Sequence, residues 1–494
     1  MAEITKRSED YSRWYLDVIR EAELADNSPV RGCMVIRPNG YAIWENIQRD
    51  LDDRFKALGH VNAYFPLLIP KSFLAKEAEH VEGFAKECAI VTHHRLKQVT
   101  HPDGRVDVVP DPESKLEEEY VIRPTSETVI WDMYRKWIQS YRDLPLLINQ
   151  WANVMRWELR TRMFLRTTEF LWQEGHTAHA TAAEGRQETL QMLETYRRFA
   201  EEALAMPVVA GTKTANERFA GAVETYSIEA MMQDNKALQA ATSHDLGQNF
   251  AKAFDVKFQS AEGQVDHVWA TSWGMSTRIV GALIMTHSDD DGLVLPPRIA
   301  RAKAVVVPIW KNDEEKAAVC EAARRLAAEL RPAIGPVHVD DRDNLRPGWK
   351  YSEWERKGVP LRLEIGPRDV AGQTAVLKSR HDRAKTTVPF AGIVAGVEAE
   401  LARIQDDLLA RARRRLVANT CRVDTWDDFV DLFENRGGGF AMCHWCGDGH
   451  CEQMVQDKTK VTIRNIPFER DETPGACVHC GKPSRGRVLF AQGY

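Results

Sequence analysis

The sequence of 494 residues contains no apolar run long enough to cross a membrane, which takes roughly 18 such residues. The first residues, MAEITKRSED, also lack the apolar stretch of a secretory signal. We therefore expect a cytoplasmic protein that does not enter a membrane.

Two common phosphate-binding patterns are missing as well. Neither G-x-x-x-x-G-K-[ST] nor G-x-G-x-x-G occurs in the chain. A protein without these loops that uses a nucleotide must hold the phosphates with side chains. Arginine suits that task because its planar fork binds phosphate oxygens in pairs. The strings VMRWELRTRMFLRT (154–167) and SWGMSTRIVG (272–281) contain candidate arginines.

Acidic residues outnumber basic ones, and the formal net charge is −6, which by itself argues against a nucleic-acid partner. The distribution is uneven, because residues 298–420 contain 24 Lys+Arg and 17 Asp+Glu. A locally cationic region can bind phosphates on an acidic chain, although a solvated surface would have the same composition.

Cysteine is unevenly distributed too. Five of the nine lie between positions 443 and 480. In a cytosolic protein, clustered cysteines bind metal more often than they form disulfides.

The element pattern predicts a change of domain near Pro296-Pro297, since two prolines interrupt any helix or strand. Apolar spacing predicts a helix from Trp44 to Leu58 that ends at Gly59, followed by an extended segment over 61–70. Beyond the prolines, we expect strands at 305–309, 359–366 and 375–380, a helix over 313–330, and a second helix over 397–417. Strands alternating with helices are typical of a small α/β domain.

Three ordered motifs carry a family resemblance. The helix and extended segment ending in Pro66 resemble motif 1 of class II aminoacyl-tRNA synthetases, Arg156-Trp157-Glu158 with Phe164 resembles motif 2, and Gly274 to Arg278 resembles motif 3. Each motif is weak alone, but their order is informative.

Longer strings narrow the family. RPTSE (123–127), FLWQEGHTAH (170–179), TSHDLGQNF (242–250), GLVLPPR (292–298) and PGWKYSEWERKGVPLRLEIGPRD (347–369) resemble prolyl-tRNA synthetases of the archaeal and eukaryotic type. The resemblance implies an antiparallel class II catalytic core over 1–297, an α/β anticodon-binding domain over 298–400, and a small C-terminal zinc-binding α+β domain over 401–494. It also implies ATP-dependent ligation of L-proline to tRNA(Pro) through a prolyl-adenylate, with Mg²⁺ bridging the phosphates.

The resemblance assigns roles to residues of the core. Arg156 and Arg278 would act in catalysis. The proline pocket would be made by Thr125, Glu127, Arg156, Trp172, Glu174, His176 and His244. ATP would be bound by Arg156, Glu158, Arg166, Thr167, Gln239, Thr242, Ser276 and Arg278. Gln239 would also help to place Mg²⁺.

In the cationic domain, the resemblance assigns anticodon recognition to Glu355, Arg362 and Arg368. Arginine and carboxylate groups can pair with the edges of unstacked bases. We expect Lys350 and Arg380 to be phosphate contacts or plain surface residues.

Two pairings are open for the cysteines. The spacing of Cys443, Cys446, Cys477 and Cys480 is that of a zinc ribbon. The family pattern instead selects Cys446, Cys451, Cys477 and Cys480, which we favour as a structural Zn²⁺ site.

Two other interpretations of the function are open. They are another class IIa synthetase, for threonine, glycine, serine or histidine, and a tRNA-binding paralogue without activity. Motif 1 further implies a homodimer. About 120 residues separate Arg156 from Arg278, too few for the editing domain that bacterial-type relatives insert there.

Overall fold

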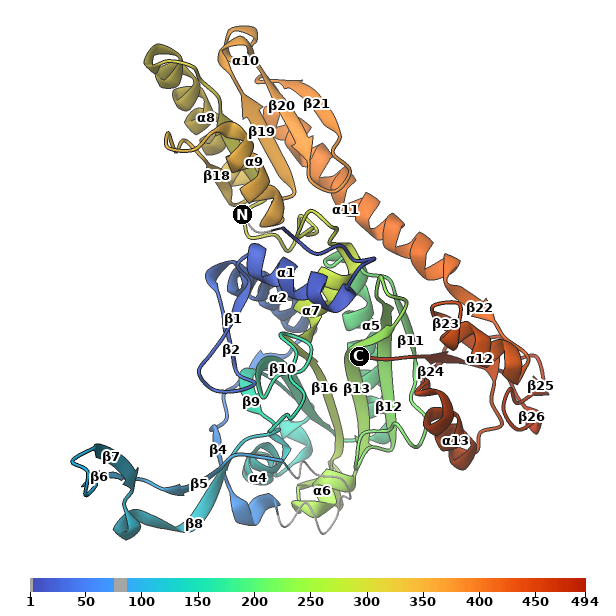
Figure 1. Cartoon of the computed structure of the whole chain (residues 1–494). Coiled ribbons are helices and arrows are strands. Elements are labelled where there is room, and N and C mark those ends of the chain that lie inside the picture. The colour runs from blue at the N-terminus through green and yellow to red at the C-terminus, as the bar shows by residue number, and fades with distance from the viewer. Residues whose placement is uncertain (1–2, 75–86) are drawn as a thin grey trace.

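The computed structural model describes residues 3–74 and 87–494. Figure 1 shows a central core, an α/β domain above it in yellow and orange, and a C-terminal domain in red beside it. No helix in the described ranges is both long enough and apolar enough to cross a membrane.

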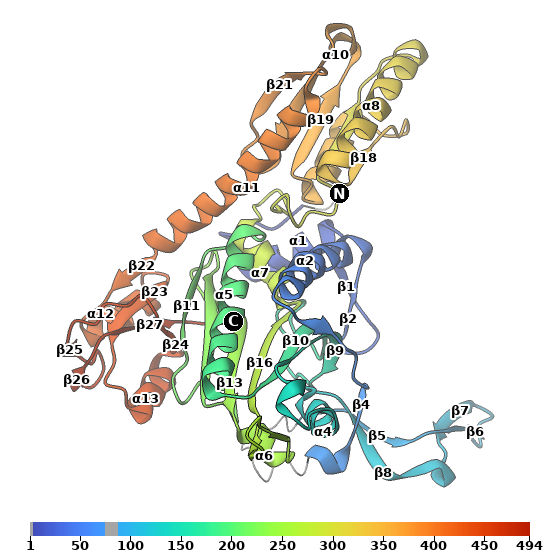
Figure 2. The same cartoon turned by 180° about the vertical axis from the view of Figure 1, so that it is seen from behind.

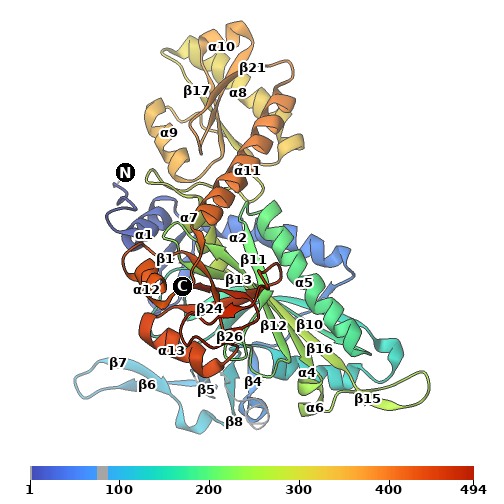
Figure 3. The same cartoon turned by 90° about the vertical axis from the view of Figure 1, so that its right-hand side faces the viewer.

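The core is built on antiparallel strands with helices on one face. Its strands lie in the order β11 (Val208–Thr212), β12 (Glu224–Met231), β13 (Ala237–Gly247), β16 (Trp269–Ser276), β10 (Glu169–His179), β9 (Leu146–Met155) and, parallel to β9 at the edge, β3 (Val61–Asn62). The main apolar cluster lies between this sheet and α1 (Tyr11–Glu21), α2 (Pro38–Ala57), α5 (Ala182–Glu202) and α7 (Arg278–His287). Figure 3 shows α5 lying along the sheet. The antiparallel core expected of a class II fold is confirmed.

Helix α2 illustrates how local sequence sets an element. Its apolar stripe, Trp44, Ile47, Leu51 and Phe55, is buried as the spacing predicts. The helix begins earlier than predicted, at Pro38, which suits the first helical turn because its missing N–H has no partner to lose there. Gly59 then adopts φ +93°, a conformation that glycine reaches without strain.

An arm projects from the core next to α4 (Glu127–Trp137). It contains the three-stranded sheet β4 (Leu68–Pro70), β8 (Lys115–Ile122) and β5 (Ile90–His93), and the hairpin β6 (Leu96–Thr100)–β7 (Val106–Pro110). Figures 1 and 2 show this hairpin at the tip, away from the sheet. The extended segment after α2 thus supplies two short strands, β3 and β4, rather than one long one.

The α/β domain has a mixed sheet of five strands. The order is β18 (Val337–Val339), β17 (Ala304–Pro308), β19 (Leu361–Ile365), β20 (Thr374–Ser379) and β21 (Lys385–Pro389). Strands β18, β17 and β19 are parallel to one another, and β20 and β21 continue the sheet through antiparallel pairings. Helices α8 (Asp313–Ile334), α9 (Pro347–Arg356) and α10 (Pro367–Gly372) accompany it. The strands and helix predicted here are confirmed.

Helix α11 (Ile393–Ala418) runs from the α/β domain to the C-terminal domain (Figure 2). The boundary expected between residues 400 and 401 falls inside this continuous helix. The C-terminal domain contains β22 (Thr420–Arg422), α12 (Trp426–Glu434), β23 (Phe440–His444), α13 (Gly449–Thr459), β24 (Thr462–Pro467) and β27 (Arg487–Ala491).

The C-terminal strands are joined to the core. Strand β24 pairs with β11 through Gly211–Pro467 and Thr212–Ile466, which makes one sheet of eleven strands. Nothing in the sequence pattern predicted this joining. The remaining short elements are β1 (Ala25–Asn27), β2 (Met34–Ile36), α6 (Asn249–Ala253), β14 (Lys257–Gln259), β15 (Val265–His267), β25 (Gly475–Ala476) and β26 (Pro483–Ser484).

Candidate active site

A cavity of about 320 Å³ opens on the face of the core sheet opposite α5. Side chains alternate along a strand, so one face of β10 presents Trp172, Glu174 and His176 to this cavity. Most of the residues assigned to substrate by resemblance line it: Thr125, Glu127, Arg156, Trp172, Glu174, His176, Gln239, Thr242, His244, Ser276 and Arg278. Their assigned roles stay predictions, but the structure brings their side chains together.

Strand register explains why these residues meet. Gly274 of β16 lies opposite both Glu174 of β10 and Thr242 of β13. Two residues further along, Ser272 lies opposite both His176 and His244. Three strands distant in sequence therefore present their polar groups in two adjacent rows.

Strand β10, which lines the cavity, requires a glycine at position 175. A Cβ on Gly175 would come within 2.1 Å of the Trp273 ring, which packs under β10. Such an overlap is far closer than van der Waals contact allows. Gly175 thus keeps the strand flat against its neighbour.

Two buried carboxylates form an anionic corner. Glu174 accepts hydrogen bonds from Ser126 (2.5 Å) and Gln150 (2.8 Å) and contacts His176 Nε2 at 2.9 Å. Burial opposes its charge, but the His176 contact and these two donors together hold the pKa of Glu174 below its usual value. Glu127 accepts a hydrogen bond from Thr125. This corner can take up a small cationic group.

Two arginines line the same cavity, Arg278 partly buried and Arg156 more exposed. Arg156 donates to the Pro124 carbonyl (2.9 Å) and lies 5.6 Å from the centres of both the Phe170 and Trp172 rings. Arg278 donates to the Leu165 carbonyl (3.1 Å). Burial lowers the pKa of both guanidiniums, and for Arg278 neighbouring arginines add to the effect. Two cations that line one cavity in this way favour a polyanionic ligand.

His244 is held neutral. Burial is the main cause that lowers the pKa of His244 to about 3, and the positive charge of His176 is the second cause. Its Nδ1 shares a hydrogen bond of 3.0 Å with Thr225 Oγ1, and the Phe219 ring lies 4.6 Å from its ring. A neutral imidazole in this place can donate or accept a hydrogen bond without adding charge.

Three residues assigned to ATP lie outside the cavity lining. Glu158 pairs with Arg166 at 2.7 Å, and the Arg166 side chain is exposed. Thr167 is buried. Because Arg278 is bonded to Leu165, the loop that carries Glu158 and Arg166 packs beside the cavity rather than within it.

Sequence reasoning missed part of the wall. Lys213, Glu217 and Phe219, from the connection between β11 and β12, and Thr225, on β12, also line the cavity. Lys213 is buried and pairs with Glu229 at 3.4 Å. No motif in a single sequence marks these residues, because they reach the cavity only when the sheet is folded.

In the α/β domain, two of the assigned anticodon residues contact each other. Arg362 donates to Glu355 (2.7 Å) and to Glu364 (2.7 Å), and its guanidinium lies 3.9 Å from the Tyr351 ring centre. Arg368, by contrast, is exposed near the start of α10. The three residues thus lie in one domain but in different environments.

The expectation for Lys350 and Arg380 was wrong. Arg380 is only 3% exposed and binds both carboxylate oxygens of Asp289, at 2.7 and 2.6 Å. Lys350 is 1% exposed and donates to the Asp340 carbonyl. Both side chains are used inside the protein, so neither faces a phosphate.

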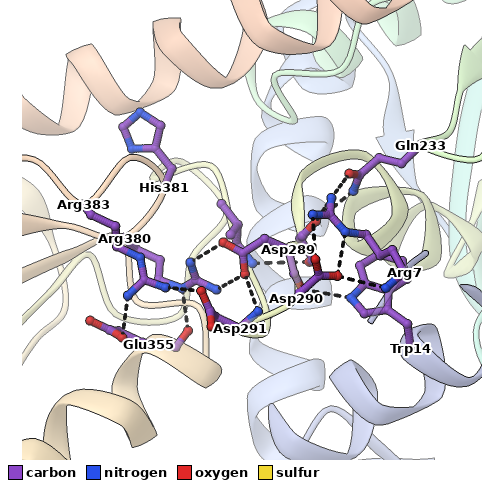
Figure 4. A network of polar contacts seen from close by, with 12 residues as sticks. Arg7, Trp14, Gln233, Asp289, Asp290, Asp291, Glu355, Arg380, His381 and Arg383 are labelled. Carbon is purple, nitrogen blue, oxygen red and sulfur yellow. Dashed lines mark hydrogen bonds and ion pairs between the residues drawn. The ribbon is translucent and has the colours of Figure 1, made fainter. Parts of the chain in front are cut away.

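Figure 4 shows Arg380 within a network that joins the α/β domain to the core. Arg383 bridges Glu355 (2.8 Å) and Asp291 (2.7 Å), while Asp290 pairs with Arg7. The acidic loop after α7 thus meets basic side chains on both of its sides.

Four cysteine thiols in the C-terminal domain converge. The sulfur atoms of Cys446, Cys451, Cys477 and Cys480 all lie within 4.8 Å of one another, and Cys443 is not among them. Cys451 and Cys477 are 3.8 Å apart. Tetrahedral sulfur ligands at ~2.3 Å from zinc are separated by about 3.8 Å, so this set fits a zinc ion.

The antiparallel sheet, the helices on one of its faces and the two arginines in the cavity on the other face define the core of a class II aminoacyl-tRNA synthetase. Residues 110–287 match the family model described as "tRNA synthetase class II core domain (G, H, P, S and T)". Residues 303–400 match "Anticodon binding domain", and residues 426–494 match "Prolyl-tRNA synthetase, C-terminal".

Full-length relatives narrow the class. A proline--tRNA ligase of Porphyromonas gingivalis is 58% identical over 494 residues, covering 100% of this chain and 99% of the relative. Proline--tRNA ligases of Bacteroides fragilis and Christiangramia forsetii are 57% and 56% identical, over 498 and 491 residues, with at least 99% of each chain covered. The chain belongs to the prolyl-tRNA synthetase family.

Proposed function

We propose that this chain joins L-proline to tRNA(Pro) in two steps, through a prolyl-adenylate. One observation carries the proposal: a single cavity is lined by the buried carboxylates of Glu127 and Glu174 and by the guanidiniums of Arg156 and Arg278. Proline has a cationic secondary amine and an anionic carboxylate, and ATP is polyanionic, so both substrates match this polarity.

In the first step, a proline carboxylate oxygen attacks the α-phosphorus of ATP. The new P–O bond forms as the bond to pyrophosphate breaks. The protein supplies no nucleophile, so its contribution is positioning and charge stabilisation. Glu127 and Glu174 hold the proline amine, Trp172 forms an apolar wall, and Arg156 spans the carboxylate and the α-phosphate.

The nucleotide is held by residues around the same cavity. Arg278 lies against the adenine, and Ser276, Thr242 and Gln239 contact the sugar and phosphates. The amide oxygen of Gln239 is the kind of ligand that Mg²⁺ accepts alongside phosphate oxygens and water. Bound Mg²⁺ would neutralise charge on the phosphates. Glu158, Arg166 and Thr167 complete the nucleotide site from the loop beside the cavity.

In the second step, a hydroxyl of the terminal tRNA ribose attacks the prolyl carbonyl, and AMP leaves. Recognition of tRNA(Pro) falls to the α/β domain, where Glu355 and Arg362 offer a carboxylate and a guanidinium to base edges and Arg368 is exposed for contact. A cytoplasmic location fits this role and stays a prediction.

The four converging cysteines hold a structural Zn²⁺. A site with four thiolates is closed to substrate, so its contribution is to the fold. Metal analysis should find about one zinc per chain. Cys451→Ser should lose it, and Cys443→Ser, which alters a buried cysteine outside the set, should retain it; equal retention in both variants would rule the set out.

The chain acts as a homodimer. Apolar side chains are exposed along the segment after α2 and on the arm, namely Val61, Tyr64, Leu68, Ile90, Leu96, Val106 and Val108. Such a surface favours a protein contact. Sedimentation should give twice the chain mass, and Tyr64→Asp should shift it toward the monomer; a wild-type monomer at micromolar concentration would refute the dimer.

The decisive experiment is amino-acid-dependent ATP–pyrophosphate exchange, measured with all twenty amino acids and no tRNA. We expect strong exchange with proline and a trace with alanine or cysteine. Exchange led by threonine, glycine, serine or histidine would transfer the assignment to another class IIa enzyme. No exchange from folded protein would favour an inactive tRNA-binding paralogue.

A further inference from the structure

The wall of the cavity that sequence reasoning missed is attached to the C-terminal domain. Residues 213–219 leave the end of β11 and contribute Lys213, Glu217 and Phe219 to the cavity. Within the segment, Glu217 N–H donates to the Thr214 carbonyl, and Phe219 N–H donates to Thr225 Oγ1. Thr225 in turn bonds His244, so movement of this segment would reach the substrate contacts directly.

Helix α13 of the C-terminal domain supports the opposite side of this segment. Thr214 Oγ1 donates to Glu452 Oε1 at 2.7 Å, and both side chains are buried. Asn216 Nδ2 donates to the Gly449 carbonyl at 2.8 Å. A Cβ on Gly449 would lie 2.7 Å from Asn216 Oδ1, so a larger residue there would displace the Asn216 side chain that makes this hydrogen bond.

A second contact comes from β24. Arg464 donates to Glu229 Oε2 at 3.1 and 3.0 Å, while Lys213 pairs with the other oxygen of the same carboxylate. Glu229 is fully buried. Two cations from different domains therefore share one core carboxylate, and the cavity-lining Lys213 is fixed by that sharing.

Glu452 is an unusual residue for such a place. Its Oε2 atom is buried and has no hydrogen-bond partner among the described residues. A buried carboxylate with an unsatisfied oxygen is unfavourable. A fold that needed only packing here would be better served by an apolar side chain, so the hydrogen bond to Thr214 is the contribution that Glu452 makes.

We propose that Glu452 is a positioning residue for amino-acid activation: through Thr214, it fixes the segment 213–219 as a wall of the substrate cavity. The C-terminal domain is then part of the active-site scaffold rather than an appendage. Figure 1 shows α13 beside the β11–β12 edge of the core, where this contact lies. Because Cys451 immediately precedes Glu452 on α13, the cysteine cluster sets the position of the helix that carries the contact.

The test uses the full chain and follows proline in ATP–pyrophosphate exchange. Glu452→Ala and Thr214→Val should each raise KM for proline about tenfold, which corresponds to ~1.4 kcal/mol, with kcat changed much less. The double variant should resemble either single one, because both remove the same bond. Glu452→Gln keeps an acceptor for Thr214 and should restore KM to near the wild-type value.

The matched control is Gln453→Ala, on the next residue of the same helix, whose exposed side chain bonds to Asp457 of α13 and to no other residue that the structure describes. Calorimetric binding of a non-hydrolysable prolyl-adenylate analogue gives a readout independent of turnover, and zinc content and thermal midpoint report on the C-terminal fold. If Glu452→Ala loses zinc, Thr214→Val decides, since it leaves α13 unaltered. Unchanged proline KM in Thr214→Val, or strictly additive effects in the double variant, would overturn the proposal.

Discussion

Charged side chains in the substrate cavity and at the junction below the α/β domain have different kinds of partner. In the cavity, Arg156 and Arg278 bond through Nε to backbone carbonyls, and among the described residues the ends of both guanidiniums have no hydrogen-bond partner, so they are available for ligand. At the junction, Arg380 is saturated by the two oxygens of Asp289 and by the Glu355 carbonyl. The difference teaches that an arginine is ready for a ligand where the fold leaves its fork unpaired, whereas a paired arginine such as Arg362 must first release its carboxylate partners.

The largest expected effect tests the unpaired arginines. Arg156→Ala should lower kcat/KM for proline-dependent exchange by about 10³-fold, because it removes a preorganised donor from the transition state. Arg160→Ala, an exposed arginine four residues along the same loop, is the control and should change exchange less than twofold. Comparable losses of exchange activity in both variants would show that the unpaired guanidinium of Arg156 has no special role.

The saturated arginine should matter for stability instead. Arg380→Ala leaves Asp289 without its partner and should lower the free energy of unfolding by roughly 2–4 kcal/mol, since Asp289 keeps some solvent access. Arg383→Ala breaks a more exposed pair and should cost less than ~1 kcal/mol. Urea unfolding measures both, and proline exchange by the folded Arg380→Ala protein should stay near the wild-type rate.

Lowering the pH should destabilise the cavity and the junction in different pH ranges. The pKa of His244 is about 3 in the folded protein and ~6.5 when unfolded, so the unfolded state binds the extra proton between these values. Stability should therefore fall by ~2 kcal/mol from this residue between pH 7 and pH 5, and His244→Asn should lack that part of the decline. Burial opposes its charge, but Arg380 holds the pKa of Asp289 below its usual value, so that pair should persist to a lower pH than an unpaired carboxylate would.

The smallest expected effect concerns proofreading. The chain between Arg156 and Arg278 forms core strands, α5, α6 and the β14–β15 hairpin, so we expect no hydrolysis of alanyl-tRNA(Pro) above the rate without enzyme. A deacylation assay with preformed alanyl-tRNA checks this. Protein-dependent release of alanine would place an editing activity in the cavity or at the junction.

The sequence predicted elements and motif residues well where one face or one short string decides the structure. The stripe of α2 and the strands of the α/β domain follow from local periodicity, whereas the cavity residues of β10, β13 and β16 were selected by the family resemblance. Favouring Cys451 over Cys443 required the family pattern, since the sequence spacing alone allowed both sets; the structure gathers the set with Cys451.

Long-range pairing was beyond such reasoning. Lys350 and Arg380 look like surface cations in the sequence, and only the fold shows that Asp340 and Asp289 lie beside them. The pairing of β24 with β11 and the contact of Glu452 with Thr214 join residues more than 200 positions apart. No local pattern encodes those partners.

The pairing of β24 with β11 also has a consequence for how the protein is made. The outer edge of β11 emerges from the ribosome about 250 residues before the strand that covers it. At ~5–20 residues per second, that edge stays uncovered for roughly 10–50 s in every round of synthesis. An open edge strand is a template for association with other chains. Nascent chains that stall or are cut short before residue 462 should therefore be the aggregation-prone species, and in the cell they should depend most on chaperones.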